Sequence, residues 1–318
     1  MVWLADLQIT EFFDGVLHMK REVSSAGLYD RFSAGDVINY VVLGIMALVC
    51  LAPVFNMIAI SFSNTAAVDG GLVSFWPKNF TLASYERIMD DENFMGTVRV
   101  SLLRVLIGTS LSLLLLFLMA YPLSMEKQEF PFRSAYVWFC IVTMLFNGGM
   151  IPTYIVVTKL GLHNTIWALT LPYLTNAFNV VLMMNFFRGL PKELRESASI
   201  DGAGPMRILW EIYVPLSKPV TATLALFCLV WFWNDYFAGL IYINNAKDYP
   251  LMTYIHSLSL SASDFVTLSG DELARRAEIG SMTYSAAKIV IAMIPIIAIY
   301  PFLQKYFVHG ITLGAVKG

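Results

Sequence analysis

Between two long apolar runs the chain reads Glu193-Leu194-Arg195-Glu196-Ser197-Ala198-Ser199-Ile200-Asp201-Gly202-Ala203-Gly204-Pro205. A helix should begin near Pro191, because the first helical turn tolerates a missing N–H. Glu193 and Glu196 then lie where the positive end of the helix dipole favours carboxylates. The charged segment 188–219 therefore predicts a short polar helix between apolar runs.

The residues that follow predict a bend and a second short helix. Gly202 and Gly204 bracket a point where φ can become positive, a conformation that other residues rarely adopt. Pro205 is well placed to open a helix, and Pro215 should end it. We therefore expect the order helix, sharp bend, helix.

The composition identifies the class of protein. Hydrophobic residues make up 57% of the 318 residues, the mean hydropathy is +0.64 and 14% of residues are charged, against roughly 25% in soluble domains. This composition predicts an all-α integral membrane protein. The net charge of −2 gives no sign of a nucleic-acid partner. Cys50, Cys140 and Cys228 lie inside apolar runs, so we expect packing residues and neither a disulfide nor a metal site.

Apolar runs of about 20 residues predict six membrane-spanning helices. The predicted spans are Val37–Ser61, Thr97–Leu123, Ala135–Val156, Ile166–Phe187, Val220–Ile243 and Ser285–Phe302. Most loop lysines and arginines fall on the side of the N-terminus, which places both termini and the loop 188–219 in the cytoplasm. The chain thus divides into a cytoplasmic N-terminal segment, 1–36, and one six-span membrane domain, 37–318, that ends in a tail, 303–318.

The charged loop carries a resemblance to a known family. Glu196-Ser197-Ala198, Gly202, Ile212 and Pro215 are similar to the E-A-A-x3-G-x9-I-x-L-P loop in the membrane subunits of ATP-binding cassette (ABC) importers. Ser197 and Val214 depart mildly from that pattern. The alternative is an ordinary bent cytoplasmic loop. The resemblance implies a helix that docks on an ATPase subunit, with these residues making or shaping the contact: Glu196, Ala198, Asp201, Gly202, Ile212 and Pro215.

Further stretches resemble carbohydrate-importer permeases, in particular the oligosaccharide group that includes the alginate importer. They are residues 146–154, 160–165, 233–236 and 305–318. The resemblance implies a bacterial cytoplasmic (inner) membrane protein that pairs with a second, homologous permease subunit. It also implies two ATPase subunits, which bind ATP and Mg²⁺, and an extracytoplasmic solute-binding protein. No cofactor is expected on this chain.

Polar residues within the predicted spans are candidates for the transport path, because such residues mark pathways or contacts between helices. They are Asn147, Asn176, Asn179, Trp233, Asn234, Asp235 and Arg104. For each asparagine, the alternative role is an interhelical hydrogen bond.

Arg99, Arg104 and Lys288 should lie toward the outer ends of their spans. One interpretation is that they recognise an acidic oligosaccharide. In the other, Arg99 and Lys288 reach the lipid headgroups while Arg104 pairs with an acid such as Asp235.

The tail repeats glycine every fourth residue, at Gly310, Gly314 and Gly318. This spacing favours close backbone approach to another protein surface, as the family resemblance implies for the ATPase. A frayed terminus is the alternative.

Other functional classes lack their motifs. The sequence holds no G-x-x-x-x-G-K-[ST], so ATP would be bound by another chain, and neither H-E-x-x-H nor G-x-S-x-G occurs. His18, His163, His256 and His309 are scattered, and we expect neither a metal site nor a catalytic residue. A secondary transporter or channel for a polar solute is the alternative function. It would need an ionisable relay in the membrane, and no clear one is present.

Overall fold

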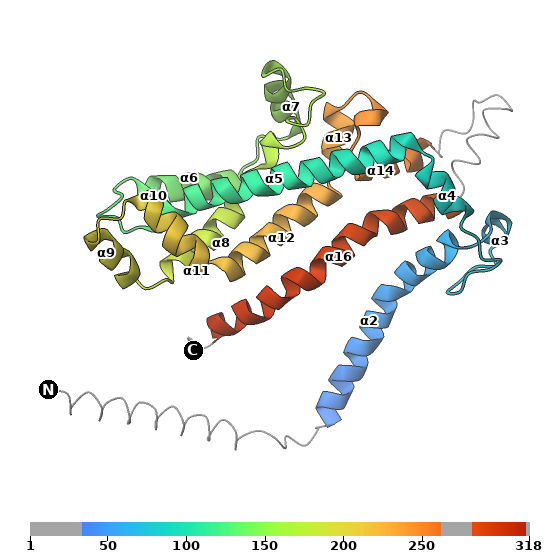
Figure 1. Cartoon of the computed structure of the whole chain (residues 1–318), viewed down its shortest axis with the longest axis horizontal. Helices are drawn as coiled ribbons and strands as arrows, with labels where there is room; N and C mark the ends of the chain where they lie inside the picture. The colour runs from blue at the N-terminus through green and yellow to red at the C-terminus, as the bar shows by residue number, and fades with distance from the viewer. Residues whose placement is uncertain (1–33, 262–281, 316–318) are drawn as a thin grey trace. The chain divides into compact units, whose positions relative to one another are not determined.

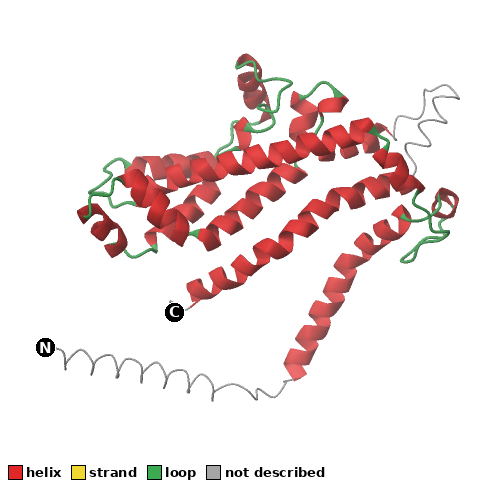
Figure 2. Ribbon diagram, viewed as in Figure 1, coloured by secondary structure: helices red, strands yellow, loops and turns green. Residues whose placement is uncertain are grey.

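A computed structural model describes residues 34–261 and 282–315 of the chain. These residues form helices, turns and loops, with no strand among them (Figure 2). The chain divides into two units, Met1–Asn56 and Met57–Gly318. Helix α2, Ala34–Ser61, runs across this division. We describe the two units separately.

The described part of the first unit is the beginning of α2. Its side chains are apolar all round and mostly exposed, as shown by Val37, Tyr40 and Leu48. The segment Val37–Ser61 is long and apolar enough to cross a membrane. A helix that is apolar on every face suits lipid better than water, so the first predicted span is supported by length and composition.

In the second unit, α5 (Glu92–Ser124) is the helix against which others pack. Helix α12, Lys218–Asn234, and helix α8, Ala177–Arg188, lie along it, with α6, Arg133–Leu145, beside its C-terminal half (Figure 1). Gly108 permits the close approach of α12, because a Cβ atom there would lie 2.6 Å from the Phe232 ring. Buried Phe117, Met183 and Leu224 fill the space between these helices.

The last helix, α16, covers Met282–Ala315 and packs against α12. Its first turns contact α3 (Thr65–Asp69), α4 (Ala83–Met89) and α14 (Leu251–Ser261). Gly310 and Gly314 are within this helix, whereas Gly318 lies outside the described residues. The helix thus extends well past the expected end of the sixth span.

The third and fourth predicted spans are not continuous helices, which corrects the sequence-based expectation. Helix α6 ends at Leu145, and α7, Met150–Lys159, leaves it at 113°. In the next segment only a 3₁₀ turn, Leu171–Tyr173, and α8 are helical. Asparagine residues explain the interruptions. The side-chain oxygen of asparagine can accept a hydrogen bond from a nearby backbone N–H, which stabilises a turn or a helix start in place of a continuous helix. The Asn147 amide oxygen accepts from the Gly149 N–H and that of Asn176 from the Phe178 N–H, each at 2.9 Å.

The fifth predicted span is interrupted in the same way. Helix α12 ends at Asn234, and the Asp235 carboxylate accepts the Phe237 N–H at 3.1 Å to start α13, Phe237–Tyr242. By length and composition, 3 of the described helices can cross a membrane, or up to 5 if each bent helix pair is one span. The predicted total of six spans is therefore not confirmed.

Candidate functional site

The charged loop folds as helix, bend, helix. Helix α9 is Glu193–Ile200, and Gly202 has a φ of 80°, the left-handed conformation that the bend needs. Pro205 opens α10, Pro205–Ile208, at the position where a missing N–H has no cost. These three predictions are confirmed, whereas Gly204 has an ordinary extended conformation.

Pro215 does not end the second helix as expected. The backbone continues from α10 through a π-helical turn, Leu209–Tyr213, into α11, Val214–Leu216. Pro215 is the second-last residue of this helical run, which ends at Leu216. The break comes instead at Ser217, where the chain turns by 85° into α12.

The expected ATPase-contacting residues differ in exposure. Glu196, Asp201, Gly202 and Pro215 are exposed, whereas Ala198 and Ile212 are half-buried. A hollow of about 300 Å³ separates α9 from the second helix; it is lined by Ala198, Asp201, Ala203, Arg207, Ile208, Glu211 and Ile212. Next to it, Ile200 is 86% exposed and Met206 is 57% exposed. Exposed apolar side chains beside a hollow are typical of a docking surface.

A second loop, residues 125–132 between α5 and α6, holds α9 in place. Glu126 forms an ion pair with Lys192, and Glu129 forms one with Arg195. The Lys192 ammonium lowers the pKa of Glu126, first by its hydrogen bond and then by its charge. Sequence reasoning missed this contact; the available signal was opposite charge in two loops assigned to the same side of the membrane.

A cavity of about 630 Å³ lies where the helices are interrupted. It brings together Asn147 from the α6–α7 break, Asn176 from the start of α8, and Asn179 one turn later. Thr143, Thr175, Tyr173 and Trp231 add hydroxyl groups and aromatic rings. Irregular backbone at membrane depth is tolerated where it lines such a cavity. The amide and hydroxyl groups that line this cavity can form hydrogen bonds with a polar, uncharged ring of a bound molecule.

The other expected path residues do not line this cavity. Trp233 is 2% exposed and its indole N–H donates to the Ala292 carbonyl at 3.1 Å, against α16. Asn234 is exposed and bonds its own helix through the Val230 carbonyl. The tryptophan in the cavity is Trp231, which sequence reasoning missed. It is 41% exposed, and its ring centroid lies 4.7 Å from that of Tyr173.

The asparagines also make the bonds that the alternative interpretation assigned to them. Asn179 donates to the Cys228 sulfur at 3.8 Å, a weak contact between α8 and α12. The amide oxygens of Asn147 and Asn176 accept local backbone N–H groups, which leaves their NH₂ groups for other partners.

Arg104 is fully buried and paired with Asp235, as one of the two interpretations of the sequence proposed. Its guanidinium donates to the Asp235 carboxylate, to the Asp235 carbonyl at 2.9 Å and to the Leu169 carbonyl at 3.0 Å. The same group lies 5.9 Å from the centroid of the Trp231 ring. The buried cation therefore lies within cation–π range of an aromatic ring that lines the cavity.

Lys288 is buried rather than extended toward the lipid headgroups, which corrects that expectation. Its Nζ lies 3.9 Å from the Asp91 carboxylate and 3.9 Å from the centroid of the Tyr284 ring. Asp91 also accepts hydrogen bonds from the hydroxyls of Tyr254, at 3.2 Å, and Tyr284, at 3.0 Å. Of the three cations, Arg99 alone is exposed.

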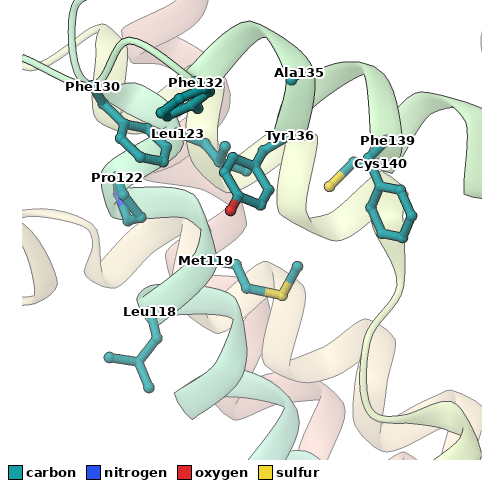
Figure 3. Close-up of a pocket in the computed structure, with 10 residues that line it drawn as sticks. All are labelled: Leu118, Met119, Pro122, Leu123, Phe130, Phe132, Ala135, Tyr136, Phe139 and Cys140. Atoms are coloured by element: carbon teal, nitrogen blue, oxygen red, sulfur yellow. The ribbon is translucent and has the colours of Figure 1, made fainter.

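A separate groove of about 750 Å³ lies between the C-terminal end of α5 and the start of α6 (Figure 3). Leu118 and Met119 line it from α5, and Tyr136 and Phe139 line it from α6. Its lining is almost entirely hydrocarbon, so it cannot satisfy the hydroxyl groups of a sugar. The polar cavity is therefore the candidate for the transport path.

Comparisons with known proteins show the family of the chain. Residues 32–313 match the family model described as "Binding-protein-dependent transport system inner membrane component". The chain is 42% identical to Protein LplC of Bacillus subtilis over 283 residues, 89% of this chain and 95% of the relative. It is 37% identical over 285 residues to the polygalacturonan/rhamnogalacturonan transport system permease protein YtcP of the same organism, covering 89% of this chain and 98% of YtcP.

A solved structure is also similar. A chain from the crystal structure of a bacterial ABC transporter involved in the import of the acidic polysaccharide alginate superposes with a TM-score of 0.79 at 31% identity, over 89% of this chain and 100% of that chain. The family match covers most of the residues described above, including the bent loop and the polar cavity. The protein therefore belongs to the family of inner-membrane components of binding-protein-dependent transport systems.

Proposed function

We propose that this chain is a permease subunit of a sugar-importing ABC transporter and moves an oligosaccharide across the bacterial cytoplasmic membrane. The observation that carries the proposal is the polar cavity at the interrupted helices, in a chain that also presents a bent docking loop. Family membership supports three kinds of partner. They are a second permease subunit, two ATPase subunits that bind ATP and Mg²⁺, and an extracytoplasmic solute-binding protein.

In this proposal the loop 188–219 is cytoplasmic and docks on an ATPase subunit. Closure of the ATPases moves α9, and the ion pairs of Glu126 and Glu129 pass that movement to the ends of α5 and α6. Both of these helices reach the interrupted region that lines the cavity. A rigid helix pair can act as a lever in this way, since packed elements move as units.

We further propose that the oligosaccharide is acidic. The support comes from the relatives, one named for polygalacturonan and rhamnogalacturonan and one solved as part of an alginate importer. No lysine or arginine lines the cavity in the described part of the chain, and Arg104 is fully buried. Charge selection, on this view, is made by the solute-binding protein or by the second permease.

Reconstitution tests the proposal. The chain is co-expressed with the second permease and the ATPase, and the purified complex is placed in vesicles with the cognate solute-binding protein. We expect ATP-dependent uptake of labelled uronate oligomers and little uptake of neutral oligosaccharides of the same length. Uptake that continues without ATP would identify a secondary transporter or channel, and a solute-binding protein that retains only neutral glycans would overturn the acidic substrate.

A further inference from the structure

Trp231 is the one tryptophan that lines the polar cavity among the described residues. Its neighbours in α12, Phe232 and Trp233, are almost completely buried, whereas the Trp231 indole is 41% exposed. The Trp231 ring is partly exposed in a cavity that amide groups also line, whereas a ring that only fills a core is buried on all sides. It offers a flat apolar face next to hydrogen-bonding partners.

The Trp231 ring is held from several sides. Tyr173 contacts it with a centroid distance of 4.7 Å and an angle of 44° between the rings, and Phe232 packs edge-on at 5.1 Å. The buried Arg104 guanidinium lies 5.9 Å from its centroid, within the range of a cation–π contact. Arg104 is fixed in turn by the Asp235 carboxylate and by the Leu169 carbonyl. These contacts favour one orientation of the Trp231 ring.

We propose that Trp231 is the stacking platform for one pyranose ring of the transported oligosaccharide, and that the Arg104–Asp235 pair positions this platform. A pyranose has C–H faces that suit an aromatic ring and hydroxyl groups around its edge. The free NH₂ donors of Asn147 and Asn176 and the hydroxyls of Thr143 and Thr175 line the same cavity and suit that edge. This inference rests on the proposed function and adds a ring-binding subsite and a positioning pair to it.

The platform is tested with the complete complex in vesicles, at saturating loaded solute-binding protein. The measurement is the number of sugar molecules imported per ATP hydrolysed. We expect Trp231→Ala to lower this ratio about tenfold and Trp231→Phe to restore most of it, because an aromatic face returns. Trp138→Ala is the matched control, since Trp138 is 65% exposed on α6 and does not line the cavity.

The possible outcomes distinguish failure of the proposed stacking role of Trp231 from failure of the proposed transport function. If the wild-type complex imports no sugar, the proposed function fails. If it imports sugar and Trp231→Ala gives an unchanged ratio, the platform is overturned. A parallel loss of uptake and of ATP hydrolysis in the Trp231 variants, including Trp231→Phe, indicates a merely structural role and also overturns it. Copurification of the ATPase confirms assembly in each case.

The positioning role of the ion pair is tested by a double-mutant cycle. Asp235→Asn should lower the import ratio in the wild-type background and have little further effect in the Trp231→Ala background, because both changes act on one interaction. Losses that simply add would overturn positioning through Trp231. Arg104→Gln should likewise lower the import ratio for uronate oligomers in the wild-type background and have little further effect in the Trp231→Ala background. An Arg104→Gln loss that adds in full to that of Trp231→Ala would show that Arg104 acts independently of the Trp231 ring and would overturn the positioning role.

Discussion

Arg104 and Lys288 are cations buried among helices, and each is stabilised by one carboxylate and nearby aromatic rings. A buried charge is tolerated when it is paired, and removing one partner leaves the other uncompensated. Asp91 also caps α5, because its other carboxylate oxygen accepts hydrogen bonds from the Asn93 and Phe94 N–H groups at the start of that helix. Loss of this carboxylate therefore has more than one consequence.

We predict that Asp91→Ala lowers the stability of the second unit by about 3–5 kcal/mol for the stranded lysine and by about 1 kcal/mol for the lost helix cap. Adding Lys288→Met to Asp91→Ala should recover the larger part, because the unpaired charge is then absent. Asp90→Ala is the control, as Asp90 is exposed. Thermal unfolding of the purified complex measures these changes; a double variant no more stable than Asp91→Ala would show that the cap alone matters.

The bend between α9 and α10 depends on one backbone conformation. Gly202 has a φ of 80°, and a Cβ atom there would meet nothing within 4 Å. A side chain at this position is therefore opposed by backbone strain and not by crowding within this chain. Because α9 and the second helix carry the docking surface together, the angle between them decides whether that surface fits its partner.

We predict that Gly202→Val reduces sugar uptake and sugar-stimulated ATP hydrolysis together, because the β-branched residue disfavours the left-handed bend by about 1–2 kcal/mol. Gly204→Val should cause a much smaller loss, since Gly204 is already extended and has equal space around it. Both activities are measured in reconstituted vesicles. Wild-type uptake by an assembled Gly202→Val complex would remove the bend from the coupling mechanism.

The described residues expose much apolar surface, including most of those in the first unit and many in α6 and α7. Such surface is normal where lipid or other subunits cover it. The tail, 303–318, is a further segment for which the glycine spacing predicts a contact with another subunit. Gly310 and Gly314 lie in α16 four residues apart, so they share one face of that helix.

We predict that deletion of 310–318 weakens recovery of the ATPase in pull-down experiments without changing membrane insertion, because no span is removed. The double variant Gly310→Ala/Gly314→Ala is the sharper test. Alanine favours the helix by about 1 kcal/mol per site, yet it adds a methyl group where close approach is proposed. Undiminished ATPase recovery with both variants would exclude a tail contact.

The bent loop could be predicted because its causes are local. Pro205 favours the start of a helix and Gly202 permits a positive φ, and both preferences belong to the residues themselves. The membrane class followed from composition in the same way. By contrast, the interruption at Asn147 was hidden inside an apolar run long enough to be read as one continuous helix.

The face of α12 that lines the cavity could not be predicted. Trp231 and Trp233 lie in a helix that is apolar on all sides, so the sequence contains no polar–apolar contrast to distinguish them. Packing against α16 buries Trp233 on the Ala292 carbonyl and leaves Trp231 open. The sequence allowed Arg104 to pair with Asp235 but did not require it, because these residues are 131 positions apart and only the packing of α5 on α12 brings them together.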